Sequence, residues 1–267
     1  MYGYQMDLLR SHLSWRETAE GVFERHCDHT WWGTGAMVGG YVQALALSAM
    51  QQANAELDKE ALSLHCQFLK PVLEEDVRAE VRVVRRGRTA TNMRCELYSQ
   101  EKMAAVALAC FAKRSDLGGF VELEAPDFAP VLAAESPVRP EVGLAAHGHF
   151  DFYPRLGSFE RGQGDAQVGG WVAPRWDAGC DVSLLAVVAD LWVPAAYHRW
   201  RDELGVVGLD ITVHFRATAA QLRGLRPMLQ LRSASALAAG GYVDEDGEIW
   251  SESGQLLCQY RQMRLVF

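Results

Sequence analysis

An acidic residue stands inside an otherwise apolar stretch of the chain. The stretch DVSLLAVVADLW, residues 181–192, carries apolar residues at helical spacing, which predicts a buried helix. Asp181 stands where the helix would begin, as an N-cap or first-turn acid, and Pro194 stands just after its end. Asp190 would lie in the last turn, where the helix dipole disfavours a negative charge and the neighbouring residues are apolar. Such a carboxylate is a candidate general base, because burial raises a carboxyl pKa towards neutrality. The alternative is that Asp190 reaches solvent or caps a nearby group.

The bulk properties of the chain limit the classes of function. Its 267 residues, 49% of them hydrophobic, suit one large domain or two small ones. A net charge of -8 and a pI of about 5.5 argue against nucleic-acid binding. There is no apolar run long enough for a membrane span, and the N-terminal stretch has no signal-peptide pattern. The six cysteines form no CxxC pair, which favours small buried side chains in a reducing cytoplasm.

Both halves of the chain show the same order of predicted elements. In each half the order is strand, apolar helix, then four strands, several of which alternate as in antiparallel sheets. The predicted helices cover residues 39–54 and 181–192. The predicted strands cover residues 23–32, 62–69, 77–84, 93–98, 103–113, 150–156, 167–173, 209–215, 228–235, 238–243 and 255–267. The acidic run DEDG, residues 244–247, is predicted to be a turn.

A stretch with little periodicity separates the two halves. Residues 114–148 contain four closely placed prolines and are predicted to be a linker that crosses a surface. The repeated order of elements predicts an α+β protein with two copies of one unit, residues 1–113 and 149–267. Each unit would place a helix on a curved antiparallel sheet.

Several segments, taken in order, resemble a known family. In the second half these are LDITVHFRA, LLCQYRQMRLV and the helix that ends in VVADLW; in the first half they are SLHCQFLKPV and the RRGR turn. They are similar to the double-hotdog acyl-CoA thioesterases of the medium-chain, type II class, over most of residues 20–267. The resemblance implies two tandem hotdog units that form a double hotdog. It also implies an acyl-CoA substrate, a role in fatty acid metabolism, and no metal or cofactor.

The resemblance further implies a catalytic site. In that family an aspartate near the end of the second helix, a threonine or serine on the next strand and a glutamine on the last strand hold a water that attacks the thioester carbonyl. Asp190 matches the aspartate and Gln262 matches the glutamine. The hydroxyl position falls on Gly208, which departs from the family pattern. The equivalent first-half positions lie near Ala49 and Ala109, so we expect one working site per chain.

These residue types suit thioester hydrolysis. A thioester is already a good acyl donor, so a carboxylate that takes a proton from water can suffice without a serine nucleophile. A glutamine amide can both accept and donate, and so can orient that water. The developing oxyanion needs a donor, and the free backbone N–H groups of a helix N-terminus can supply one. The candidate donors are Gly179, Cys180 and Asp181 in the second half and Gly39 and Gly40 in the first.

Other interpretations stay open at this stage. Because Gly208 has no hydroxyl, the alternative function is a non-catalytic acyl-CoA or lipid-ligand binding protein on the same fold. A hotdog hydratase or dehydratase is disfavoured, since no Asp–His pair stands at the helix entry. Gln262 would otherwise be an outward strand residue. Pairing through exposed sheet edges predicts a homodimer or higher homo-oligomer.

Two weaker motifs carry no prediction of a site. The glycines of residues 33–39 do not fit a dinucleotide fingerprint, since the third comes one residue late. The run His-Cys-Asp-His at residues 26–29 fits no standard zinc spacing, and on a strand its side chains would alternate between two faces.

Six arginines are candidates for contacts with CoA phosphates or for a solvated rim: Arg85, Arg86, Arg88, Arg216, Arg223 and Arg226.

Overall fold

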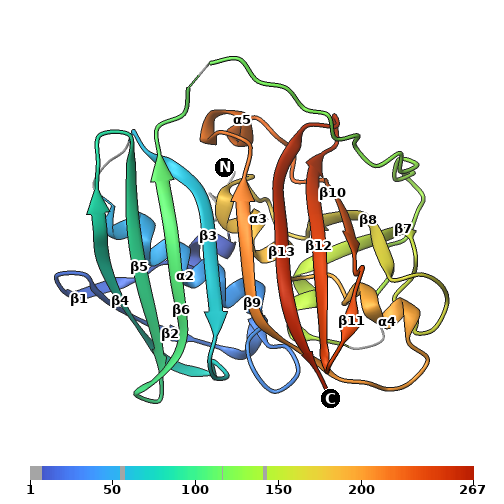
Figure 1. Ribbon diagram of the computed structural model, residues 1–267, viewed down its shortest axis with the longest axis horizontal. Helices are drawn as coiled ribbons and strands as arrows, with labels where there is room; N and C mark the ends of the chain where they lie inside the picture. The colour runs from blue at the N-terminus through green and yellow to red at the C-terminus, as the bar shows by residue number, and fades with distance from the viewer. Residues whose placement is uncertain (1–7, 55–57, 116, 141–142) are drawn as a thin grey trace, which may run out of the picture.

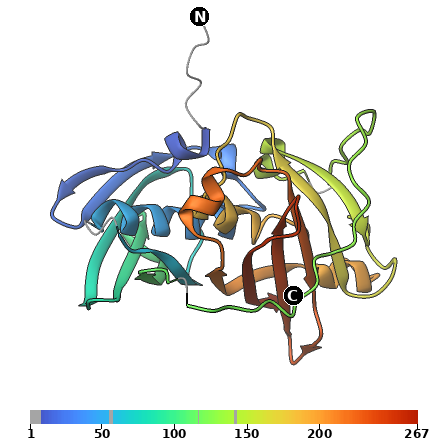
Figure 2. The same ribbon diagram turned by 90° about the horizontal axis from the view of Figure 1, so that it is seen from above.

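One continuous antiparallel sheet runs through the whole molecule. The computed structural model describes residues 8–54, 58–115, 117–140 and 143–267. Within them the strands follow the order β1-β2-β4-β5-β6-β3-β9-β13-β12-β10-β8-β7, and the short β11 pairs with β12. The sheet curves around the helices α2 and α3, which lie side by side at the centre of the molecule (Figure 1, Figure 2).

The elements of the described chain are as follows. In the first half they are α1 (Leu8–His12), β1 (Arg16–Ala19), β2 (Val22–Cys27), η1 (His29–Trp31), α2 (Gly39–Ala53), β3 (Glu60–Phe68), β4 (Glu75–Arg86), β5 (Ala90–Ser99) and β6 (Lys102–Ala112). In the second half they are η2 (Ala145–His149), β7 (Phe150–Leu156), β8 (Gln167–Pro174), α3 (Val182–Val188), α4 (Ala195–Arg199), β9 (Val206–Phe215), α5 (Ala219–Arg223), β10 (Leu229–Ala234), β11 (Ala238–Ala239), β12 (Tyr242–Ser251) and β13 (Leu256–Val266).

The two halves repeat the same arrangement on either side of the β3–β9 pair. Outward from this pair the order is β3, β6, β5, β4, β2, β1 in one direction and β9, β13, β12, β10, β8, β7 in the other. In each half two strands come before the helix, and four long strands follow it. At the junction His65 pairs with Thr212, and Nδ1 of His65 lies 2.8 Å from Oγ1 of Thr212. The predicted α+β fold of two tandem units is therefore confirmed.

The two central helices contact each other across the halves, the N-terminal part of α2 against the C-terminal part of α3. Within α2 the residues from Gly40 to Leu47 are all buried, so this part of the helix is enclosed on every side. A Cβ atom on Gly40 would lie 2.4 Å from the carbonyl oxygen of Val187, so glycine permits this close approach. Nε2 of Gln43 donates to the carbonyl of Ala186 at 2.7 Å. The N-terminus of α2 thus packs on the C-terminal end of α3.

Two sequence predictions about the second half are wrong in their details. The helix predicted over residues 181–192 ends at Val188, and Asp190 lies in the turn that follows it. Pro194 lies beyond this turn, where it is the N-cap residue of α4. The run DEDG at residues 244–247 is not a turn but lies within β12. Its acidic side chains are tolerated in a strand because they pair with arginines of β13, as Asp244 does with Arg261 at 2.9 Å.

The chain between β6 and η2 contains no helix or strand in the parts that the structure describes. It passes along the outside of the molecule from one half to the other (Figure 1). Specific bonds hold it there: Nε1 of Trp171 donates to the carbonyl of Ala129, and Arg155 pairs with Glu135 at 2.8 Å. Across the described chain, no helix is long and apolar enough to cross a membrane.

Candidate active site

Asp190 lies at the centre of the molecule, where the two helices meet. Its side chain is only 10% exposed. The backbone N–H of Gly40, in the first turn of α2, donates to its carboxylate. A Cβ atom on Gly39 would lie 2.6 Å from Oδ2 of Asp190, so only glycine leaves room for the carboxylate here. Asp190 therefore faces the positive end of the α2 dipole, rather than only the negative end of its own helix.

Asp190 belongs to a buried network of four polar side chains. Nη2 of Arg264 lies 2.9 Å from Oδ1 of Asp190 and 3.4 Å from Oε1 of Glu245. Nε2 of Gln262 donates to the same oxygen of Glu245 at 2.6 Å. The other oxygen of Glu245 accepts from the backbone N–H of Ala195, at the start of α4, at 2.7 Å. Nη2 of Arg264 thus links Asp190 to Glu245, and Glu245 in turn binds Gln262.

The charges of this network act on Asp190 in opposite directions. Burial raises the pKa of Asp190 above its ordinary value, Arg264 lowers it, and Glu245 raises it further. Burial alone would lower the pKa of Arg264, but Glu245 and Asp190 raise it, so the guanidinium stays charged. Cys66 of β3 is the other titratable neighbour, and both burial and the charge of Asp190 raise its pKa. The raised pKa of Asp190 suits a group that must take up a proton.

Gly208 lies directly opposite Arg264 on neighbouring strands. The ladder between β9 and β13 is irregular here: Met263 pairs with Asp210 and Arg264 pairs with Gly208, which leaves Leu209 as an extra residue. Opposed residues of an antiparallel pair place their side chains on the same face. The position predicted for the hydroxyl therefore faces the network, on the same side as the guanidinium.

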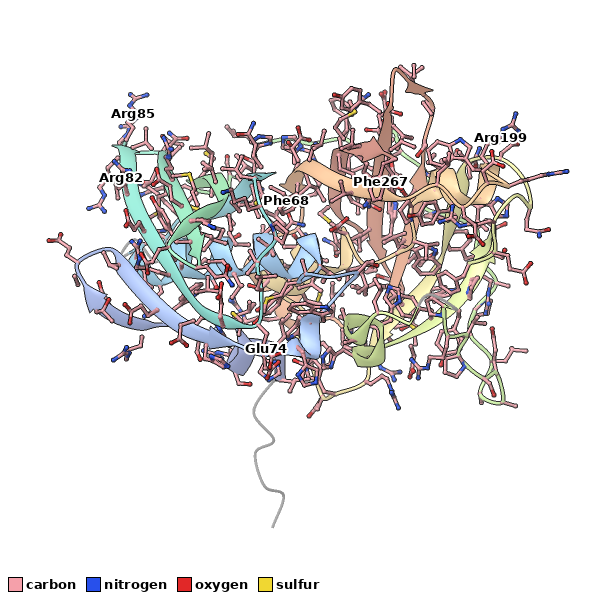
Figure 3. All side chains as sticks on the ribbon, turned by 90° about the horizontal axis from the view of Figure 1, so that it is seen from below. Phe68, Glu74, Arg82, Arg85, Arg199 and Phe267 are labelled. Carbon is pink, nitrogen blue, oxygen red and sulfur yellow. The ribbon has the colours of Figure 1, made fainter. Side chains whose placement is uncertain are left out.

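The ring of Phe68 covers this part of the site. A Cβ atom on Gly39 would lie 2.9 Å from the ring, and one on Gly208 would lie 3.5 Å from it. Phe68 ends β3 and is only partly buried. Figure 3 shows it in the middle of the molecule, where the two halves meet. A substrate that reaches Asp190 from this side would pass the ring.

The two groups of predicted oxyanion donors lie in different places. Gly39 and Gly40 begin α2 and adjoin Asp190. Gly179, Cys180 and Asp181 come just before α3, so a helix of seven residues, about 10 Å long, separates them from Asp190. Asp181 caps that helix, since its side chain accepts from the N–H of Leu184 at 2.9 Å. The three residues line a separate hollow of about 750 Å³ together with the C-terminal part of α2.

Five hollows of the described surface have volumes of about 470 to 800 Å³. None of the five is lined by Asp190, Gln262 or Arg264. The largest lies against the linker, and another, of about 620 Å³, lies on the outer face of the second half around Arg216 and Arg232.

Two protein-family models together match most of the chain. The model of the acyl-CoA thioesterase N-terminal domain matches residues 28–112, and the model of the C-terminal domain matches residues 125–266. The chain belongs to the acyl-CoA thioesterase family. No curated protein matches the sequence.

Solved structures agree with this membership at the level of the fold. A protein of unknown function with a hot dog fold from Alicyclobacillus acidocaldarius has a TM-score of 0.91 at 21% identity, over 98% of each chain. The acyl-CoA thioesterase II TesB2 from Mycobacterium marinum has a TM-score of 0.76 at 18% identity, over 97% of this chain and 98% of that one. The predicted double hotdog is confirmed.

Sequence reasoning did not find two members of the network in this thioesterase-family chain. The sequence pattern predicts only a place in the closing strand for Arg264 and a place in a turn for Glu245. One signal was available: Gln262 and Arg264 are two residues apart on a strand, so a prediction that places one side chain inward places the other inward too. A buried arginine needs acidic partners, which would have directed attention to the DEDG run.

Proposed function

We propose that the protein hydrolyses acyl-CoA thioesters to free acid and CoA, with Asp190 as the general base. The supporting observation is the position of a buried carboxylate of raised pKa against the N-terminus of a 15-residue helix. Attack of water on a thioester requires a general base and, next to it, a hydrogen-bond donor to the carbonyl oxygen. Membership of the thioesterase family supports the same reaction.

The reaction divides among the groups that surround Asp190. Asp190 takes a proton from water as the water oxygen bonds to the thioester carbonyl carbon. The carbonyl oxygen becomes negative and is stabilised by the backbone N–H of Gly39 at the start of α2, while the N–H of Gly40 holds the carboxylate of Asp190. The C–S bond then breaks, the free acid leaves, and the CoA sulfur takes up the proton.

Gln262 would orient the water through its carbonyl oxygen. Its amide nitrogen already donates to Glu245 at 2.6 Å. Its Oε1 atom is buried and has no hydrogen-bond partner in the part of the chain that the structure describes. The bond to Glu245 thus fixes which end of the amide is available, and the available end is an acceptor for a water proton.

Two observations favour the second candidate, an acyl-CoA or lipid-ligand binding protein without turnover. Asp190 is paired with Arg264, and position 208 has no hydroxyl. Such a protein would gain thermal stability with acyl-CoA but would release no thiol.

A cytoplasmic location, a role in fatty acid metabolism and self-association stay predictions.

Release of free thiol from short, long and aromatic acyl-CoAs, with wild type and Asp190→Asn, tests the proposal. Asparagine can still accept from Arg264 and Gly40, so the fold should persist while the base is lost. We expect kcat to fall by about 10²- to 10⁴-fold, as for the loss of a general base. Asp210→Asn, on β9 outside the network, is the matched control and should keep its activity. A wild-type protein that is stabilised by acyl-CoA but releases no thiol would instead support the binding function.

A further inference from the structure

Two unsatisfied polar atoms lie close together on the inner face of β13. Nε of Arg264 and Oε1 of Gln262 are both buried and have no hydrogen-bond partner among the described residues. Their residues are 7% and 2% exposed. Because they are two positions apart on a strand, their side chains lie on one face with Cα atoms about 7 Å apart. An unsatisfied donor beside an unsatisfied acceptor, both buried, is the usual setting of an ordered water.

The shape of the guanidinium places this water next to Asp190. Nε and Nη2 share one edge of the planar group, and Nη2 is the nitrogen that lies 2.9 Å from Oδ1 of Asp190. A water that accepts from the Nε–H therefore lies beside that carboxylate. It can donate one hydrogen bond to Oε1 of Gln262 and another to the carboxylate of Asp190.

Position 208 supplies no hydroxyl that could bind this water. Gly208 lies opposite Arg264 and has no side chain on the face that both share. A Cβ atom there would meet only the ring of Phe68, at an ordinary contact distance of 3.5 Å. A serine or threonine at this position would have placed a hydroxyl on the face that Arg264 shares.

We propose that Arg264 holds the attacking water through its Nε–H and so takes over the role that a hydroxyl at position 208 would have had. This inference rests on the proposed hydrolysis and adds a catalytic residue to it. Arg264 donates a hydrogen bond to the water oxygen, Gln262 accepts a hydrogen bond from one O–H of the water, and Asp190 removes the other proton as the water attacks the thioester carbonyl. Arg264 keeps its own proton throughout, so the overall reaction is unchanged.

The test compares kcat, KM and the pH profile of thiol release for wild type, Arg264→Gln, Arg264→Lys and Arg264→Gln combined with Gly208→Ser. Arg261→Gln is the matched control, because Arg261 lies on the same strand but is exposed and pairs with Asp244. We expect Arg264→Gln to lower kcat by about 100-fold, as for the loss of one aligned donor, with little change in KM. Adding Gly208→Ser should restore part of this loss, and Arg261→Gln should behave as wild type.

The pH profile separates this role from a purely structural one. Asp190 is faced by Arg264 on β13, Glu245 on β12, Cys66 on β3 and the N–H of Gly40 on α2. Since Arg264 lowers the pKa of Asp190, Arg264→Gln should move the acid limb of kcat/KM to higher pH. Arg264→Lys keeps the charge but not the second N–H on the same edge. It should leave the acid limb in place and still lower kcat by about 10- to 100-fold.

A crystal structure provides a readout that does not depend on activity. It should show an ordered water within about 3.2 Å of both Nε of Arg264 and Oε1 of Gln262. A dry gap there, or wild-type kcat in Arg264→Lys, would overturn the role of Arg264. If Asp190→Asn abolishes turnover and both Arg264 variants keep it, the inference fails while the proposed hydrolysis stands. Absence of any wild-type turnover would refute both.

Discussion

At the scale of single residues, the basicity of Asp190 is set by two charged neighbours on different strands. Arg264 lowers the pKa of the carboxyl and Glu245 raises it, while burial raises it most. Arg264 also bridges the two carboxylates through one nitrogen. The reactivity of the base therefore depends on a pair of residues that do not themselves take the proton.

Glu245→Gln should move the acid limb of kcat/KM to lower pH. The base works only when Asp190 is deprotonated, so the limb follows its pKa, and removing the negative charge of Glu245 lowers that pKa. A glutamine can still accept from Ala195, so the start of α4 should keep its contact. The measurement is kcat/KM for one acyl-CoA from acid to neutral pH.

Glu248→Gln is the control for this shift. Glu248 lies on the same strand and pairs with Arg232 at 2.6 Å, outside the network. Its pH profile should match that of wild type. An acid limb that moves equally in both variants would show that general charge, rather than the contact with the network, sets the profile.

At the scale of elements, the two helix N-termini have different tasks. The N-terminus of α2 adjoins Asp190 and has Val38 as its N-cap, which provides no side-chain hydrogen bond. The N-cap residue therefore leaves the first-turn N–H groups to other partners, and Asp190 binds that of Gly40. The N-terminus of α3 is capped by Asp181 and points away from Asp190. Only the first can serve the carbonyl oxygen of a substrate at Asp190.

Asp181→Ala should therefore reduce stability without reducing catalysis. Loss of an N-cap side chain costs about 1 kcal/mol of the free energy of unfolding. The urea midpoint should fall while kcat stays at the wild-type value. Asp177→Ala, an exposed residue just before the cap, should change neither. A large fall in kcat for Asp181→Ala at a temperature where the protein is folded would place α3, not α2, at the substrate carbonyl.

At the scale of the whole molecule, the site exists only because the two halves are joined. The pairing of β3 with β9 makes one sheet of them, and the close contact of α2 with α3 brings Gly40 to Asp190. The base, the arginine and the glutamine come from the second half, and the N–H donors come from the first. A change at the helix contact should thus affect stability and catalysis together.

Gly40→Ala tests this coupling. The added methyl group would lie 2.4 Å from the carbonyl oxygen of Val187, so the helices must move apart. We expect a loss of about 1–3 kcal/mol in the free energy of unfolding from overpacking, larger than the gain in helix propensity. Because the donors move away from Asp190, kcat should fall as well. Thermal unfolding and thiol release measure the two effects.

Gly179→Ala is the matched control at the other helix. A Cβ atom there would meet nothing within 4 Å, so stability and kcat should both remain near the wild-type values. Equal losses in both variants would mean that the contact of the helices is not the cause.

Local sequence patterns determined much of the fold. The alternation of Val77 to Val84, the apolar run of α2 and the repeated order of elements predict two copies of a helix on an antiparallel sheet, because periodicity depends on near neighbours in the chain. The same local reasoning singled out Asp190 as a carboxylate among apolar residues. The family resemblance added Gln262 and the glycine at position 208.

The tertiary structure alone decided how these residues are used. Arg264 and Asp190 are 74 positions apart, and their pairing depends on the register of β13, on the bulge at Leu209 and on where α3 ends. Likewise, the acidic run that holds Glu245 is compatible with a turn until arginines of the next strand neutralise it. Which helix N-terminus faces Asp190 follows from the packing of the two halves. Contacts of this kind depend on the whole arrangement of the chain, so no local pattern can reveal them.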